Sequence, residues 1–455
     1  MPALRTFFLT CLATAWLCLV SAPLQARCID EERLEGTGAA PDEPSPAQVN
    51  PRATLQGLVR DALDRSQAVG ASRLLAEAAV SDIDETRATR LPQASLSAGV
   101  GPGGTLQQGV NDAAALQIRA NLNVSQLLYD GGRVDRLTDW RTQLAESARL
   151  GHLTVREQLA MNTVALALER SRFRQHVVIY SQYVRKMECL VEALETIVRA
   201  DRGRASELVQ ARKTLQQAQL LQTGAQSQAR AVDVRLRRLV GDGLPGVQGL
   251  STVLLEVNPL SDLVADVERS TEIGAITAQA AAANAYARVV ESGSKPQVSW
   301  AFTGGGAAAV GRNPDTPGSG RSGNFSLGLA VNVPLYSPGL APASDAARRR
   351  AEAANLQRME ALESRRYRVV EVHEQTTSSF DRARRVGAVL RDSEQLRNFT
   401  LQQWQQLGRR SLFDVMGAEA EHYNLRVAYI NALHDGQQMN AMLLSLGRGV
   451  SEWLR

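Results

Sequence analysis

Two stretches of the chain alternate strictly between apolar and polar or small residues. In the segment 116–124, LQIRANLNV, every second side chain is apolar, and the segment 325–333, FSLGLAVNV, repeats the pattern. In a third stretch, Val298, Trp300 and Phe302 occupy alternate positions. A period of two predicts β-strands with one apolar and one polar face. Such strands fit either a soluble sheet over a core or a barrel with lipid outside and water inside.

Longer stretches follow the period of a helix instead. Apolar side chains recur at spacings of three and four along two long runs: Tyr180, Tyr183, Met187, Leu190, Leu194 and Ile197 in one, and Ala225, Ala229, Val232, Leu236 and Leu239 in the other. This spacing predicts helices that pack on one another along a heptad seam. A helix of about 60 residues extends ~90 Å. Most of such a helix must lie far from any sheet.

Several short motifs occur twice at an offset of about 204 to 207 residues. The pairs are DRSQAVG with ERSTEIG, LPQASLSAGVG with KPQVSWAFTGG, LLYDGG with PLYSPG, and RGRAS with LGRRS. The order of the landmarks predicts a tandem duplication whose unit is a helix, a strand, a loop, a second strand and a long helical hairpin.

The expected boundaries follow from these landmarks. The first repeat spans 53–247, with strands at about 94–101 and 116–124 and a hairpin tip at about 200–206. The second spans 248–455, with strands at about 297–304 and 324–333 and a tip at about 406–412. The fold class is therefore mainly α with a small antiparallel β part.

The N-terminus has the layout of a secretory signal. Arg5 precedes an apolar run at 7–20, and the small residue Ala26 ends a segment 1–26 that we expect to be cleaved. The run is shorter than the ~20 residues of a membrane helix. Residues 27–52, which contain several Pro, Glu and Asp, are expected to form a flexible tether.

Composition and the remaining cysteines narrow the class of protein further. The chain of 455 residues has 51 basic and 47 acidic side chains, and this near balance excludes the basic stripe of a nucleic-acid-binding protein. Cys28 and Cys189 would remain after cleavage. Cys189 falls in a helical stretch, which favours two separate thiols, while a disulfide between them or lipidation of Cys28 stays open.

The strands raise a further constraint. Four strands cannot close a barrel, and the open edges of a sheet cannot face lipid because their backbone groups would lack partners. If the strands lie in a membrane, the protein must therefore assemble with copies of itself.

The duplicated order, the proline before the first strand of each unit, the aromatic turn after the second and the Gly-Arg tips resemble the TolC family of outer-membrane efflux and type I secretion channels. The resemblance covers about 55–447. It implies a homotrimer in which a 12-stranded barrel in the outer membrane continues into a periplasmic α-helical tunnel. It also implies a periplasmic adaptor and an inner-membrane ABC or RND transporter as partners.

The resemblance also suggests roles for residues at the hairpin tips. In GRRSLFDVMGAE, Arg410 corresponds to an entrance latch and Asp414 to a carboxylate of the pore constriction, with Ser206 and Glu207 of the other tip as latch partners. Adaptor contacts are expected at Gly203, Arg204, Gly408 and Arg409. The family's second ring carboxylate and tip tyrosine are absent, since Gly417 and Gln405 stand there. The alternative is that these charges are ordinary solvated groups at helix ends.

Nothing in the sequence predicts an enzyme, a cofactor or a metal site. The five histidines show no repeated ligand spacing, and GVGPGG at 99–104 connects two strands rather than a strand and a helix. A periplasmic coiled-coil adaptor remains the alternative to a channel, although such a protein would have one long hairpin rather than two.

Overall fold

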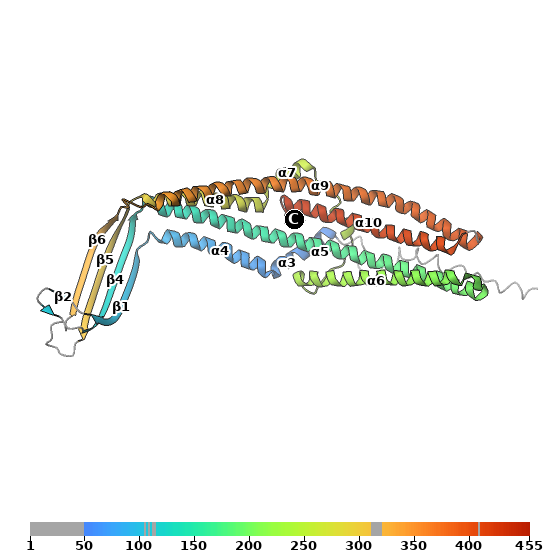
Figure 1. The fold of residues 1–455 in the computed structure, drawn as a ribbon, viewed down its shortest axis with the longest axis horizontal. Coiled ribbons are helices and arrows are strands. Elements are labelled where there is room, and N and C mark those ends of the chain that lie inside the picture. The colour runs from blue at the N-terminus through green and yellow to red at the C-terminus, as the bar shows by residue number, and fades with distance from the viewer. Residues whose placement is uncertain (1–49, 104–105, 108–109, 112–114, 311–320, 408–409) are drawn as a thin grey trace, which may run out of the picture.

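The computed structural model describes residues 50–103, 106–107, 110–111, 115–310, 321–407 and 410–455. The expected signal segment, nearly all of the expected tether, and Gly408 and Arg409 lie outside the described residues. Figure 1 shows an elongated molecule with a small sheet at one end and long helices over the rest of its length. The expected fold class, mainly α with a small antiparallel sheet, is confirmed.

The same order of elements occurs twice. The first unit consists of α3 (Pro51–Arg65), α4 (Gln67–Ala88), β1 (Gln93–Gly103), β2 (Leu106–Gln107), β3 (Val110–Asn111), β4 (Ala115–Tyr129), α5 (Arg133–Ala200), η2 (Arg202–Arg204) and α6 (Ala205–Val240). The second consists of η3 (Leu250–Thr252), α7 (Leu260–Asp266), η4 (Val267–Arg269), α8 (Thr271–Glu291), η5 (Ser292–Ser294), β5 (Gln297–Val310), β6 (Arg321–Asn332), α9 (Leu340–Leu407), α10 (Leu412–Leu446) and α11 (Val450–Leu454). The descending helices α5 and α9 each have 68 residues.

A serine cap divides the helical stretch before β1 into two helices, α3 and α4. The Ser66 side chain accepts a hydrogen bond from the Val69 amide at 3.3 Å, so it caps α4 and interrupts the run after Arg65. Ser270 caps α8 in the same way through the Ile273 amide. The two serines belong to the repeated motifs DRSQAVG and ERSTEIG, and this motif is therefore a helix start.

The four main strands form one antiparallel sheet in the order β1-β4-β5-β6. Side chains directly opposite each other in such a ladder point to the same face. One row across the sheet consists of Leu96, Leu122, Gly304 and Phe325, and the next row consists of Ser95, Asn123, Thr303 and Ser326. The register thus collects the apolar positions of all four strands on one face and the polar positions on the other.

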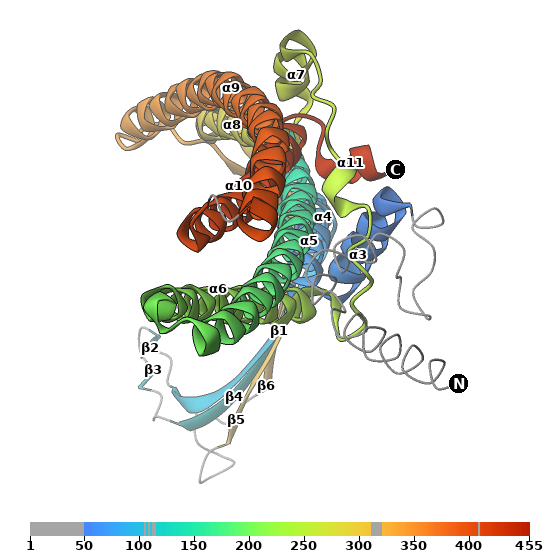
Figure 2. The same cartoon turned by 90° about the vertical axis from the view of Figure 1, so that its right-hand side faces the viewer.

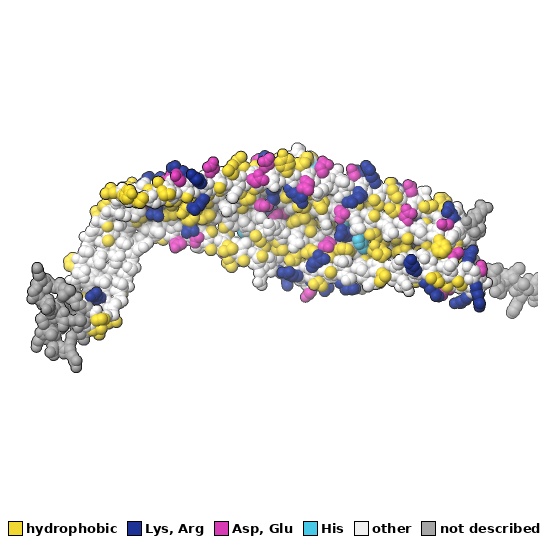
Figure 3. All heavy atoms as spheres, in the orientation of Figure 1, with side chains coloured by type: hydrophobic (Ala, Val, Ile, Leu, Met, Phe, Trp, Pro, Cys, Tyr) yellow, Lys and Arg dark blue, Asp and Glu magenta, His cyan; other side chains and the backbone are white. Residues whose placement is uncertain are grey.

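Among the described residues, no helix covers either face of this sheet (Figure 1). Large apolar side chains such as Leu327 remain 73% exposed in the protomer. Figure 3 shows the face turned to the viewer, on which few hydrophobic side chains appear. The strands β1 and β6 each pair on one side only, and both edges of the sheet are open.

The helices supply the cores of the molecule. One cluster joins α3, α5, α6, α10 and α11, and a second joins α5 and α6 to α9 and α10 nearer the hairpin tips. A smaller cluster of alanines lies between α8 and α9. Figure 2 shows the two hairpins, α5–α6 and α9–α10, next to each other along the body.

Cys189, on α5, differs from the expectation of two separate thiols. This cysteine is disulfide-bonded. A helical position was compatible with a bridge, since one helix face can meet a segment from elsewhere in the chain.

The turn from β4 into α5 depends on two glycines. Asp130 is buried and accepts hydrogen bonds from the amides of Gly132, at 2.9 Å, and Val134. Gly131 and Gly132 have φ angles of 65° and 82°, which only glycine adopts easily. A Cβ on Gly131 would also collide with the side chain of Lys295, whereas a Cβ on Gly132 would meet nothing within 4 Å.

We therefore expect Gly131→Ala to cost more stability than its matched control Gly132→Ala. The control should lose about 1 kcal/mol for the positive φ, and Gly131→Ala about 3 kcal/mol because steric overlap is added. Chemical unfolding of the detergent-solubilised protein measures both. Equal losses of unfolding free energy in the two variants would show that overlap with the Lys295 side chain does not affect stability.

Candidate functional site

The two hairpin turns lie at the end of the molecule opposite the sheet (Figure 1). The first turn joins α5 to α6 through η2, and the second joins α9 to α10. Six of the eight site residues expected from the sequence lie in the described parts of these turns. The other two are Gly408 and Arg409.

The first tip is a tight reversal built around an aspartate. Asp201 ends α5, and its carboxylate accepts a hydrogen bond from the Gly203 amide at 2.9 Å. Arg204 follows as the last residue of η2, and Ser206 and Glu207 lie in the first turn of α6. The Glu207 Oε2 atom is shielded from solvent and makes no hydrogen bond to any described residue.

The second tip is a helix start with a capping box. The Ser411 hydroxyl accepts from the Phe413 amide at 3.1 Å, and Asp414 Oδ2 accepts in return from the Ser411 amide at 3.3 Å. Arg410 Nη1 lies 3.9 Å from the same Asp414 oxygen, and Arg410 Nε donates to Gln403 at 3.2 Å. Both charged side chains are about half exposed.

Within one protomer, the structure pairs Arg410 with Asp414 and does not bring it to Ser206 or Glu207. A pair this exposed contributes less than about 1 kcal/mol. The role of Asp414 in its own helix start explains a carboxylate here without any pore.

A buried ion cluster that was not predicted from the sequence lies between α5, α9 and α10. Glu419 on α10 has an exposed fraction of 0%, and its two oxygens face Lys186 Nζ of α5 at 3.5 Å and Arg397 Nη1 of α9 at 3.6 Å. The cluster therefore ties the first hairpin to the second. A signal was present, since Glu419 interrupts a seam of apolar residues that runs through Leu412, Met416 and Tyr423 at spacings of four, three and four.

An aromatic contact lies beside this cluster. The rings of Tyr183 on α5 and Tyr423 on α10 are 4.9 Å apart between centroids. Burial, with the nearby Glu419 carboxylate as a second cause, raises the pKa of Tyr183 to about 12. The tyrosine is therefore neutral at physiological pH and contributes to hairpin packing as an apolar ring.

His176 and His434 are also neutral packing residues. Burial lowers the pKa of His176 on α5 to about 4, and Arg172 adds a second lowering effect. Burial likewise lowers the pKa of His434 on α10 to about 4.

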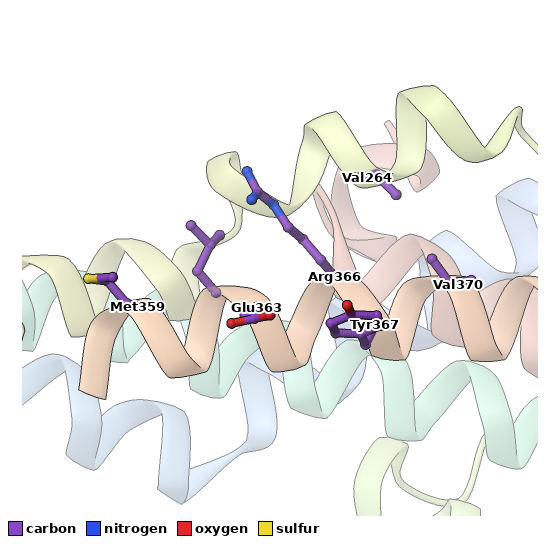
Figure 4. A pocket seen from close by; sticks show the side chains of 7 residues that line it. Val264, Met359, Glu363, Arg366, Tyr367 and Val370 are labelled. Atoms are coloured by element: carbon purple, nitrogen blue, oxygen red, sulfur yellow. The ribbon is translucent and has the colours of Figure 1, made fainter. Parts of the chain in front are cut away.

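Several open grooves occur on the described part of the helical body, among them one beside α6 and one beside α7. One, of about 690 Å³, lies between α6 and α10 near the tips and is lined by Tyr183, Leu220, Phe413 and Met416 among others. Figure 4 shows the other, of about 420 Å³, between α7 and α9, where Met359, Tyr367 and Val370 line the floor and Arg366 lies beside Val264. Arg366 is paired with Glu268. Neither groove presents a nucleophile with an adjacent base.

The described residues form neither a metal site nor a membrane-spanning helix. These residues contain no group of three or more His, Cys, Asp or Glu side chains able to hold a metal ion. In the same part of the chain, no helix is long and apolar enough to span a membrane.

We expect Glu419→Gln to destabilise the protein by about 3 to 5 kcal/mol, because two buried cations would face a neutral amide. Glu371→Gln is a matched control, since Glu371 forms an exposed pair with Arg368 on α9 and should lose less than about 1 kcal/mol. The denaturant midpoint of the two variants measures the difference. Similar midpoints would mean that Glu419 contributes nothing to the joining of the hairpins.

The fold and the tips can now be compared with known proteins. Residues 58–242 match the model of the outer membrane efflux protein family. No curated protein matches the chain. Among solved structures, CusC has a TM-score of 0.75 at 18% identity and covers 87% of this chain and 92% of its own. A membrane protein from Pseudomonas aeruginosa has a TM-score of 0.75 at 19% identity, and the match covers 87% of this chain and 92% of that protein. VceC of Vibrio cholerae has a TM-score of 0.73 at 18% identity, and the match covers 87% of this chain and 96% of VceC.

These matches confirm the resemblance inferred from the motifs. The efflux family consists of outer-membrane channels, which agrees with the expected location and with the expectation that the chain is not an enzyme. At identities below 25%, the solved structures speak for the fold alone. The chain is thus similar to the outer membrane efflux proteins across its first repeat and has the fold of TolC-like outer-membrane channels over most of its length.

Proposed function

We propose that the protein is the exit duct of a tripartite export machine in the outer membrane. The observation that carries this proposal is the sheet, which has one apolar face, one polar face and two open edges, and which is joined to helices of 68 residues. Such helices extend ~100 Å. A lipid-facing sheet and a long helical body are the two parts that a conduit across the periplasm and outer membrane requires.

Closure of the sheet needs copies of the same chain. The open edges of β1 and β6 must pair before the strands can lie in lipid. Three protomers with four strands each give a barrel of 12 strands, with the apolar face toward lipid and the polar face toward water. The open edges and the family likeness together support the proposed homotrimer.

Exposed side chains at the junction of sheet and helices support a membrane boundary there. Tyr129 at the end of β4 and Tyr336 after β6 are both exposed, Tyr336 to 87%, and Leu335 beside it is equally open. Aromatic rings with a polar tip favour the interface between hydrocarbon and water. The two tyrosines occupy matching positions of the repeats and would form part of an aromatic girdle.

The partners are assigned by analogy with such channels. The tips, including Gly203 and Arg204, and with them Gly408 and Arg409 outside the described residues, would contact a periplasmic adaptor. The apolar groove between α6 and α10 near this end suits the helices of such an adaptor. An inner-membrane ABC or RND transporter would supply the cargo, either a secreted protein or small toxic molecules.

The first test combines location, assembly and strand orientation. The protein should fractionate with the outer membrane and run as a trimer in mild detergent. Cysteines placed at Arg119, Asn123 or Asn332 should react with a membrane-impermeant thiol reagent, while those at Ile118, Leu122, Leu327 or Val331 should be protected by lipid. Leu122 and Asn123 form the sharpest pair because they are neighbours on opposite faces. A soluble periplasmic monomer would refute the channel. The same result is the one expected if the protein is instead a periplasmic adaptor.

We propose that the entrance latch is a contact between the tips of two different protomers. Arg410 is half exposed and only loosely paired in its own chain, while Glu207 has an oxygen without a donor among the described residues. If Arg410 contacted Ser206 or Glu207 of another protomer, it would therefore lose only weak interactions within its own protomer. Three copies of Asp414 around a narrow pore would concentrate negative potential and favour cations.

Planar bilayer recordings separate these two roles. Arg410→Ala should raise single-channel conductance because it removes a contact that holds the entrance closed. Asp414→Ala should leave conductance near its starting value and reduce cation preference and block by polyvalent cations, since it removes charge from the constriction. If both variants match the wild type in all three properties, the tip charges are solvated helix-end groups only.

A further inference from the structure

The bridged cysteine of α5 lies in the half of that helix that leads to the first hairpin tip. Its neighbours Met187 and Leu190 are buried in the second core cluster, whereas Cys189 itself is half-buried. The residue is disulfide-bonded. Cys189 thus lies at the margin of the packed seam, where a segment from elsewhere in the chain can reach its sulfur.

The sequence limits the choice of a partner. The chain has four cysteines, and the other three, Cys11, Cys18 and Cys28, all precede the described residues. Cys11 and Cys18 belong to the apolar part of the expected signal segment, 1–26, whose removal accompanies export. Cys28 is then the remaining cysteine with which Cys189 can pair in the exported chain.

The path of the chain through α3 and α4 points toward the hairpin tips. On α4, Ser72 bonds to His152 of α5. Further along α4, Asp82 pairs with Arg141, which comes earlier in α5. The two helices therefore run in opposite directions, and the chain followed back from α4 to α3 leads along α5 away from the sheet, as Figure 1 shows. The segment that precedes α3 enters it from the hairpin side.

This segment is long enough for the bond. The helix α3 packs in the first core cluster, whose buried residues on α5 end at Leu168. Cys189 lies 21 residues, or ~32 Å, further along the helix. The 22 residues from Cys28 to Asn50 span up to ~70 Å when extended. They can therefore reach Cys189 with length to spare.

We propose that Cys28 is the partner of Cys189, and that residues 28–50 form a strap along α5 between this bond and the start of α3. When the bond forms, each thiol loses its proton, and the two electrons pass to a thiol oxidase of the periplasm, whose own disulfide is reduced to a dithiol. Export places the chain in a compartment where such bonds persist. The inference goes beyond the proposed export function and does not depend on it.

The bond decides between the two fates of Cys28 that the sequence left open. A lipid would occupy the same sulfur as a thioether, so a Cys28 side chain in a disulfide cannot be lipidated. A lipid would also tie the N-terminus to the membrane. The disulfide ties it instead to the helical body, at a position of α5 nearer the hairpin tip than the sheet (Figure 1).

Peptide mapping of the full-length protein identifies the bond directly. Free thiols are blocked at cell lysis, and the protein is digested without reduction. Trypsin releases Cys28 in the peptide 28–33, CIDEER, and Cys189 in the peptide 187–199, MECLVEALETIVR. We expect the two peptides as one linked species that separates into both on reduction. A peptide 187–199 with a blocked thiol, or one linked to a second copy of itself, overturns the proposal.

Serine variants test the pairing from both sides. The denatured but unreduced wild type should contain no thiol that reacts with maleimide. Cys28→Ser should expose one reactive thiol at Cys189, and Cys189→Ser should expose one at Cys28. The control Cys18→Ser changes the signal segment and should give the wild-type result. If Cys189 stays unreactive in Cys28→Ser, Cys28 is not its partner.

The intact mass tests the lipid alternative. The mature chain should be lighter than its reduced form by two hydrogen atoms, and acyl chains on Cys28 would instead add their mass and overturn the strap. These results are separate from those that test the export function. Absence of the linked peptide from an outer-membrane trimer overturns the strap alone, whereas a linked peptide in a soluble monomer overturns the proposed function alone.

Discussion

Backbone hydrogen bonding at the two edges of a four-stranded sheet is the constraint on which the rest of this structure depends. The strands β1 and β6 each expose a row of amide and carbonyl groups, and the sheet has an uncovered apolar face. In water the apolar face is unfavourable, and in lipid the unpaired edges are unfavourable. In the proposed trimer, pairing between copies of the chain satisfies the edges and lipid covers the apolar face, and the long helices extend from the closed ring of strands.

The helical body obeys a different requirement, which is to hold two hairpins together over a great length. Apolar seams with many alanines provide most of the contact. Buried ion pairs are placed where the hairpins meet, such as Glu419 between Lys186 and Arg397, and also within the first hairpin, where Asp233 pairs with Arg170. Because a buried charge is costly without its partner, such clusters penalise any arrangement in which the helices slide or separate. They specify alignment more than they add stability.

At the tips, a residue with a local structural role is also proposed to act in the assembled channel. Asp414 completes a capping box and lies near Arg410 in its own chain. These contacts are weak because both side chains are half exposed. Residues with weak local partners can exchange them for partners in another chain at little cost, which suits a region that must close and open.

The sequence by itself determined the duplication, the strands with their apolar and polar faces, the long helices and the reversal near Gly203, because each depends on local periodicity or on a turn residue. The apolar seam interrupted at Glu419 carried a signal of a buried charge, but this signal was not used to predict one. Only the tertiary structure decided that Ser66 breaks the first helix, that Cys189 is bridged, and that Lys186 and Arg397 meet around Glu419. These features join residues far apart in the chain or depend on competition between near-equal local conformations, and periodicity carries no information about either.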